Sequence, residues 1–223
     1  KIMIKLDILA IGAHPDDVEL GCAGTIAKEI SNGKKVGIVD LTRGELGTRG
    51  DAKIRDSESK NAAEFLGAEF RKNLGFSDCF FTNDNEHQMK LVEIIRKYKP
   101  DVVICNAIQD RHIDHSKAAK LVGDACFLSG LKKISTTSDS VSQDPWRPIN
   151  VYHYIQWNNN KPDFFALFIL YNFLMNAFEC FRMESNRYYR QFKINLIILH
   201  MSIYFSNERI STCIDSRSFQ GQT

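Results

Sequence analysis

The sequence has 223 residues, of which 43% are hydrophobic and 25% are charged, and its formal net charge is +2. These values are typical of a globular protein with one medium-sized domain. So small a charge argues against a strongly basic surface for nucleic acid and gives no reason to expect an acidic membrane surface as a partner.

Six cysteines are scattered along the chain, at positions 22, 79, 105, 126, 180 and 213. They form no Cys-x-x-Cys pair, so a structural zinc knuckle is not expected. Cys22, Cys105 and Cys126 fall within apolar runs, where we expect them to be buried as small hydrophobic side chains. The first apolar run leads to no signal-peptide cleavage site, and together with the unpaired thiols this predicts a reducing, cytoplasmic location.

A short apolar run at residues 6–13 predicts a first strand, buried in a parallel sheet. The tetrapeptide HPDD follows at 14–17, and helical periodicity continues over 18–33. Proline and aspartate are typical of a helix start, so the tetrapeptide has a purely structural explanation. Its position also suits a functional site, because ligands bind outside the carboxyl ends of strands in open α/β sheets.

A second buried strand is predicted at 35–41, followed by a loop rich in glycine and charge at 42–50 and a helix at 52–66. Charged side chains in and after the loop include Arg43, Glu45, Arg49 and Arg55. They are typical of a solvated loop. Alternatively, they form the wall of a substrate pocket, where arginine binds anionic groups through its planar fork.

A helix at 86–98 and a buried strand at 101–107 precede a second polar motif, HIDH at 112–115. A helix is predicted after it, at 116–131. Two histidines three residues apart are common on protein surfaces, but these follow a buried strand as HPDD does, so both loops open onto the same rim of the sheet. Histidine and aspartate match the ligand preference of zinc, whose catalytic sites need three protein ligands and one open position.

Residues 132–148 have the composition of a surface loop, and residues 151–157 alternate as a strand does. The alternation of strands and helices predicts an α/β domain over residues 1–164, with a Rossmann-like, mostly parallel sheet and helices on both faces. The first strand is followed by GAHPDD rather than G-x-G-x-x-G, which argues against a dinucleotide-binding protein.

The composition changes abruptly after residue 164. The segment 164–181 is apolar and about long enough to span a membrane, but Asn172, Asn176 and Glu179 would be costly in lipid. We therefore prefer a buried helix and do not expect membrane contact. One hypothesis for the divergent segment 165–223 is a shift of the reading frame near residue 164, which resequencing of the coding DNA would test.

Three segments together resemble the PIG-L/LmbE-type zinc deacetylases: AHPDDVELGCAGT, LTRGELGTRG and RHIDH. The resemblance extends from about residue 4 to residue 164. LTRGELGTRG is most similar to the branch that deacetylates N-acetylglucosaminyl malate in bacillithiol biosynthesis. The resemblance implies a hydrolase that removes the N-acetyl group of a small N-acetylglucosamine conjugate, with one zinc ion per chain and with a homo-oligomeric assembly in many members.

The resemblance also implies roles for the motif residues. His14, Asp17 and His115 would be the zinc ligands, and Asp16 would be the general base for the attacking water. The acetamide carbonyl would be polarised by the metal.

Further roles follow from the same resemblance. His112 would stabilise the oxyanion or donate a proton, and Asp114 would orient one of the histidines as an outer partner. Arg55, Arg49 and Glu45 would bind the substrate.

Two alternatives remain open. One is a deacetylase for another N-acetylated sugar or a glycolipid. The other is a catalytically inactive relative that binds metal or sugar. The complete ligand set and the presence of Asp16 argue against the inactive relative, which zinc content without acetate release would support.

Overall fold

The computed structural model describes residues 4–48, 51–157 and 162–164, all within the first of two compact units of the chain, residues 1–168. Arg49 and the segment 165–223, with its membrane-span and frameshift hypotheses, lie outside the described residues. In the described part of the chain, no helix is long and apolar enough to cross a membrane.

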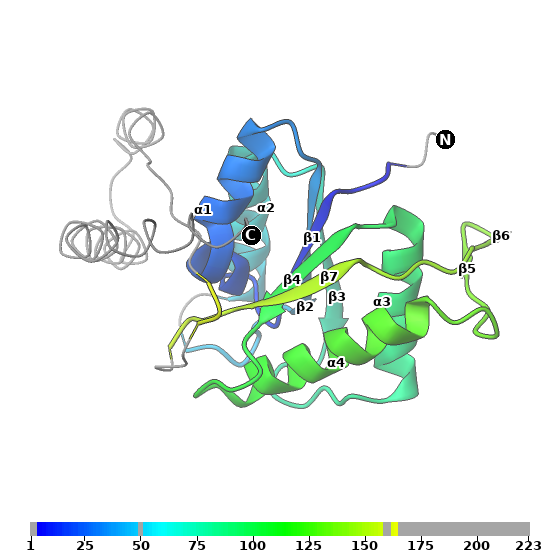
Figure 1. Ribbon diagram of the computed structural model, residues 1–223. Helices are drawn as coiled ribbons and strands as arrows, with labels where there is room; N and C mark the ends of the chain where they lie inside the picture. Colours follow the sequence, from blue (N-terminus) through cyan, green and yellow to red (C-terminus); the bar gives the residue numbers. More distant parts are fainter. Residues whose placement is uncertain (1–3, 49–50, 158–161, 165–223) are drawn as a thin grey trace, which may run out of the picture. The chain divides into compact units, whose positions relative to one another are not determined.

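Five strands form one sheet in the order β3-β2-β1-β4-β7 (Figure 1). They are β1 (Ile8–Gly12), β2 (Val36–Thr42), β3 (Phe70–Phe76), β4 (Val102–Asn106) and β7 (Asn150–Tyr154). Every pairing in this sheet is parallel, and β1 pairs with β2 on one side and β4 on the other. The predicted α/β fold with a mostly parallel sheet is therefore confirmed.

Three of the predicted strands, β1, β2 and β4, are apolar and mostly buried, whereas β7 was predicted from its alternating pattern. All five residues of β1 and all seven of β2 are buried. Strand β3 was not predicted, because it lies at the edge of the sheet and its charged residues interrupt the apolar pattern. The predicted loop at 132–148 contains a short antiparallel pair, β5 (Thr137–Ser138) and β6 (Val141–Ser142).

Four helices connect the strands of the sheet: α1 (Asp17–Ser31), α2 (Ala52–Leu66), α3 (Asn85–Tyr98) and α4 (Ile113–Ser129). All four were predicted, but α4 begins three residues earlier than expected. Its N-cap is His112, whose Nδ1 accepts a hydrogen bond from the Asp114 amide at 3.3 Å. Histidine is not a usual N-cap residue, so this start could not be predicted from the residue types.

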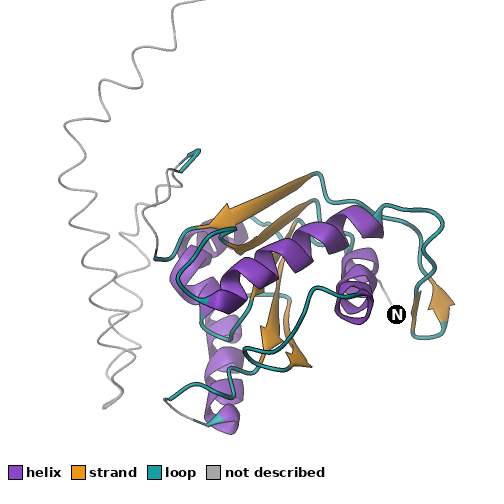
Figure 2. Ribbon diagram, turned by 90° about the horizontal axis from the view of Figure 1, so that it is seen from below, coloured by secondary structure: helices purple, strands orange, loops and turns teal. Residues whose placement is uncertain are grey.

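The helices cover both faces of the sheet (Figures 1 and 2). Ile8 and Ala10 pack with α1 and α2, whereas Leu9 and Ile11 pack with α3 and α4, since successive side chains of a strand point to opposite faces. The predicted burial of three cysteines is confirmed: Cys22 lies in the first of these cores, and Cys105 and Cys126 lie in the second.

The connections determine where a site can form. The chain leaves β1 toward the α1 face, and it leaves the neighbouring strand β4 toward the opposite, α4 face. In open α/β sheets, ligands bind at this kind of switch point, outside the carboxyl ends of the two strands. HPDD follows β1 and HIDH follows β4, so the fold brings both motifs to this crevice.

Candidate metal centre

Asp17 lies between two histidines at the carboxyl ends of β1 and β4. Its Oδ2 is 3.4 Å from Nδ1 of His14, and its Oδ1 is 3.1 Å from Nε2 of His115. All three side chains are buried. Asp17 lies in the first turn of α1, and His115 lies in the first turn of α4. The two helices therefore fix the backbone positions of these residues. The structure thus places the three predicted ligands side by side.

The Asp17 carboxylate is held by amide groups from other elements. Nδ2 of Asn106 donates to Oδ2 at 3.0 Å, and Nε2 of Gln156 donates to Oδ1 at 3.2 Å. Burial raises the pKa of Asp17, but hydrogen bonds from His115 and His14 outweigh this effect and lower it. Asp17 is therefore ionised and oriented.

The far nitrogen of each histidine faces another carboxylate. Nε2 of His14 lies 3.1 Å from Asp78 Oδ1 and 3.3 Å from Asp114 Oδ2, while Nδ1 of His115 lies 3.2 Å from Asp110 Oδ1. Metal-ligating histidines typically donate their second N–H to such an outer carboxylate. This arrangement leaves the nitrogens that face Asp17 able to bind a cation, so the donor set fits a zinc-type metal ion.

Two sets of side chains that include His14 bring their ligand atoms close together. Ligand atoms of His14, His112 and His115 lie within 4.8 Å of one another, and so do those of His14, Asp78 and Asp114. In the second grouping, the His14 atom that faces both carboxylates is Nε2. In the first, Nδ1 of His112 already accepts the helix-capping hydrogen bond.

The histidines differ in their protonation. Burial lowers the pKa of His14, but the hydrogen bond and charge of Asp17 raise it more, to about 9. Burial likewise lowers the pKa of His115, and Asp17 again raises it further. The pKa of His112 is lowered, first by burial and then by the charges of the other two rings. His112 is therefore the neutral ring of the three.

Asp16 occupies the N-cap position of α1, but its side chain makes no capping hydrogen bond. The helix start therefore explains the position of its backbone and not the type of its side chain. The carboxyl group is half-buried, and its pKa is raised, first by burial and then by the charge of Asp17. A half-buried carboxylate that is not used for capping is suited to accept a proton.

His112 lies against the other two histidines, with its ring centre 4.7 Å from that of His14 and 5.0 Å from that of His115. Because its Nδ1 accepts the Asp114 amide hydrogen, the proton of the neutral ring is assigned to Nε2. His112 can therefore donate a hydrogen bond from Nε2.

The predicted substrate-binding residues behave differently from one another. Arg55 is half-buried, and its guanidinium packs so closely on Gly44 and Gly47 that a Cβ at either position would overlap it. Glu45 accepts a hydrogen bond from the Asp78 amide at 2.8 Å, which gives it a role in shaping the loop. Arg43 pairs with Asp56.

Four polar residues of the site were not predicted: Asn106, Asp110, Asp78 and Gln156. Asn106 and Asp110 follow or end the predicted strand at 101–107, and polar residues at the carboxyl end of a buried strand are a signal that could have identified them. Asp78 follows the strand that was missed. Gln156 reaches Asp17 from the far end of the described chain, a contact for which the sequence holds no local signal.

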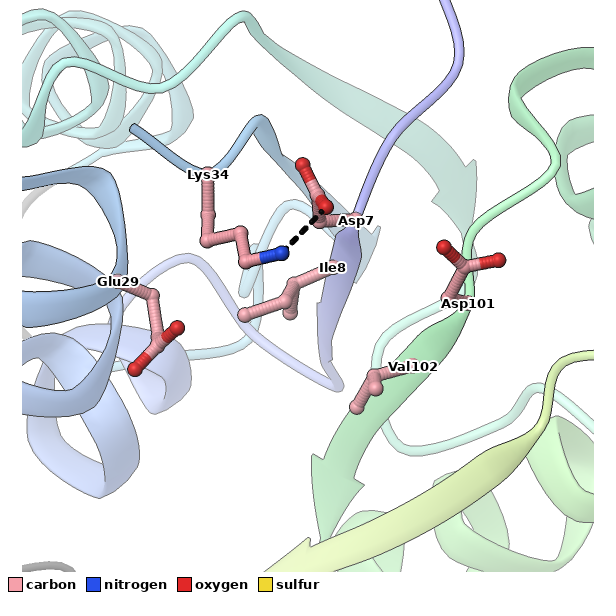
Figure 3. A pocket seen from close by; sticks show the side chains of 6 residues that line it. All are labelled: Asp7, Ile8, Glu29, Lys34, Asp101 and Val102. Carbon is pink, nitrogen blue, oxygen red and sulfur yellow. Dashed lines mark hydrogen bonds and ion pairs between the residues drawn. The ribbon is translucent and has the colours of Figure 1, made fainter. Parts of the chain in front are cut away.

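A separate hollow of about 150 Å³ lies at the opposite end of the sheet (Figure 3). It lies beside the amino ends of β1 and β4. Three of its four charged residues form ion pairs: Lys34 contacts Asp7 at 3.0 Å, and Asp101 contacts Lys5 at 3.0 Å. It contains none of the motif residues.

Comparison with known proteins adds a family to this geometry. Residues 9–126, more than half of the chain, match the PIG-L family, described as GlcNAc-PI de-N-acetylase. The chain is 40% identical over 114 residues to the uncharacterized deacetylase YaiS of Escherichia coli, a match covering 48% of this chain and 61% of YaiS.

Two further proteins to which the chain is similar are both diacetylchitobiose deacetylases. The chain is 30% identical over 174 residues to diacetylchitobiose deacetylase of Thermococcus kodakarensis, covering 71% of this chain and 62% of that protein. The structure of N,N'-diacetylchitobiose deacetylase from Pyrococcus horikoshii matches with a TM-score of 0.71 at 25% identity, covering 91% of this chain and 79% of that one. The chain spans about three fifths of the length of YaiS and of the Thermococcus deacetylase, 61% and 62% respectively.

Proposed function

Because this chain belongs to the PIG-L family of GlcNAc-PI de-N-acetylases, we propose that it hydrolyses the N-acetyl group of an N-acetylglucosamine conjugate in a metal-dependent reaction. The observation that carries the proposal is the position of Asp17 between His14 and His115, with an outer carboxylate behind each imidazole.

We assign His14, Asp17 and His115 as the ligands of one zinc ion. The assignment is supported by the paired orientation of both rings, each with one nitrogen toward Asp17 and one toward an outer carboxylate. When bound, zinc supplies Lewis acidity, which polarises an acetamide carbonyl and makes water more acidic.

Asp16 is the proposed general base. Amide hydrolysis requires that the attacking water lose a proton and that the leaving amine gain one. The raised pKa of Asp16 lets its carboxylate take the proton from water and pass it to the amine nitrogen. The Nε2–H of His112 is the proposed hydrogen-bond donor to the oxyanion, a contribution typically worth about 2.7–4 kcal/mol.

For the substrate, we propose N-acetylglucosaminyl malate, as in bacillithiol biosynthesis. The support is the sequence similarity of the loop at 42–50 and the position of Arg55, which is close enough to Asp16 for their charges to interact. The malate group is anionic, and an arginine fork binds carboxylates in a bidentate manner. Arg55 would hold this group while the acetamide lies beside Asp16.

The experiment is acetate release by the purified full-length chain from N-acetylglucosaminyl malate and, in parallel, from N,N'-diacetylchitobiose. Each assay is run as purified, after chelation, and after zinc is restored. Release that stops on chelation and returns with zinc is the expected result.

The controls separate the parts of the proposal. Release from diacetylchitobiose alone would retain the deacetylase and reject malate recognition. A folded, zinc-loaded chain that releases acetate from neither substrate would overturn the proposed activity and favour a relative that only binds metal or sugar.

A further inference from the structure

Arg71 is a buried arginine on β3 that contacts the metal-site turn from behind. Its side chain is 5% exposed, although it lies on an edge strand. Nε and Nη2 donate to the two carboxylate oxygens of Asp40 on β2, each at 2.8 Å. The guanidinium also pairs with Glu19 on α1. One side chain therefore links β3, β2 and α1.

The guanidinium also donates to two backbone carbonyls. One is that of Ser59 on α2, at 3.2 Å, and the other lies in the proposed catalytic turn. Nη2 donates to the backbone carbonyl of Pro15 at 2.8 Å. That carbonyl belongs to the peptide bond that joins Pro15 to Asp16, so the hydrogen bond fixes the plane from which Asp16 extends.

The two proposed ligands in the same turn have their own supports. His14 contacts Asp78 and Asp114, and Asp17 is held by Asn106 and Gln156.

Asp16 differs from both, because it makes no capping hydrogen bond. No capping hydrogen bond anchors its carboxylate, so the backbone that Arg71 holds contributes to the direction in which this carboxylate points. A misplacement of about 1 Å in a reacting group can reduce turnover about a hundredfold.

We propose that Arg71 is a positioning residue that aims Asp16 through the Pro15 carbonyl, while the metal ligands are held independently of it. The inference rests on the proposed function of Asp16 as the general base. If the proposal is right, a residue of the edge strand β3 contributes to turnover, although β3 is far from HPDD in the sequence.

The test is Arg71→Lys in the full-length chain. Lysine keeps the positive charge beside Asp40 and Glu19 but lacks the fork needed to reach the Pro15 carbonyl as well. The matched control is Arg96→Lys. Arg96 is 1% exposed and donates to three backbone carbonyls, those of Ser129, Ile134 and Leu131, in the core on the other face of the sheet.

Three quantities are measured for both variants: kcat and KM for acetate release, zinc per chain, and the unfolding temperature. We expect Arg71→Lys to lower kcat about 10- to 100-fold, with KM within about threefold and zinc content unchanged. Arg96→Lys lowers the unfolding temperature to a similar extent and leaves kcat unchanged. Equal kcat in the two variants, or loss of zinc in step with loss of activity, would overturn the proposal.

A readout without turnover separates this inference from the proposed function. The amide of Asp16 is bonded to the Pro15 carbonyl, so its NMR chemical shift responds to the hydrogen bond from Arg71. It should move in Arg71→Lys and not in Arg96→Lys. An unmoved signal overturns the inference even if the wild-type chain releases no acetate. If Arg71→Lys does not fold, the neutral cluster Arg71→Met with Asp40→Asn and Glu19→Gln, which leaves no unpaired buried charge, takes its place.

Discussion

Oδ1 of Asp110 lies 3.2 Å from Nδ1 of His115, at the opposite end of the imidazole from Asp17. Its Oδ2 has no hydrogen-bond partner among the described residues, although it is buried. Nδ1 of His115 likewise makes no hydrogen bond of good geometry in the described part of the chain, so the contact is an ion pair. A carboxylate beside a metal-ligating histidine helps to orient the ring and increases its basicity.

Asp110→Asn should therefore weaken zinc binding about 10- to 100-fold, since outer partners of metal-ligating histidines contribute on this scale. Asparagine keeps an oxygen that can accept the His112 amide, which Asp110 Oδ1 accepts at 3.1 Å. Zinc affinity is measured by competition with a chelating dye. The control is Asp139→Asn at an exposed position, and equal affinities in the two variants would contradict the role of Asp110.

Asp16→Asn should keep one zinc per chain and lower kcat by roughly 10²–10⁴, the usual contribution of a general base. Asp17→Asn should instead lose zinc, because Asp17 lies between both histidines. Metal content by mass spectrometry and acetate release are measured on the same samples. If Asp16→Asn lost zinc and Asp17→Asn kept it, the two roles would have to be exchanged.

Zinc affinity should rise with pH up to about 9. In the metal-free chain, burial lowers the pKa of His14, but Asp17 raises it to about 9, so zinc must displace a proton below that pH. One displaced proton corresponds to about a tenfold gain in affinity per pH unit. Calorimetry in buffers of different ionisation enthalpy measures the proton release, and a flat affinity between pH 6.5 and 9 would refute the assignment of His14.

The raised pKa of His14 also predicts how the stability of the metal-free chain depends on pH. The folded pKa of His14 lies above the unfolded value of 6.5, so protonated His14 stabilises the fold fully below that value. This stabilisation is lost as the pH rises through about 9. The unfolding temperature of the metal-free chain should therefore fall over this range, and the zinc-loaded chain should show less of this fall.

Gly21→Ala should destabilise the fold by about 1–3 kcal/mol, the usual cost of overpacking a core. A Cβ at Gly21 in α1 would overlap the buried ring of Tyr154 in β7, whose hydroxyl donates to the Ile11 carbonyl at 3.2 Å. Gly123→Ala in α4 is the matched control. A Cβ there meets no atom within 4 Å, and alanine should stabilise the helix by about 0.5–1 kcal/mol. Denaturant unfolding at fixed zinc concentration measures both.

The features predicted best from the sequence are the strands in which almost every residue is buried. Runs at 6–13, 35–41 and 101–107 became β1, β2 and β4, because strands buried on both faces are apolar throughout. The two motif loops could be placed at one rim because parallel strands end at the same edge.

Strand β3 escaped prediction because it is an edge strand with only one fully buried residue, Phe76. Two residues of the site region were lost with it, Arg71 on the strand and Asp78 after it. Polar residues in such a segment are expected on the protein surface. Only the tertiary structure shows that both side chains are nearly buried.

The contact between His14 and Asp114 joins residues that are 100 positions apart in the chain. During synthesis, the ribosome therefore releases one part of the metal site well before the other. At about 5–20 residues per second, several seconds separate HPDD from HIDH. In that interval the nascent chain carries only two of its three proposed ligands, and β4, one of the two strands that pair with β1, is made only near the end of it. Stable binding of zinc by the three proposed ligands is thus expected only after α4 has been made, when β4 can pair with β1 and bring the two motif loops together.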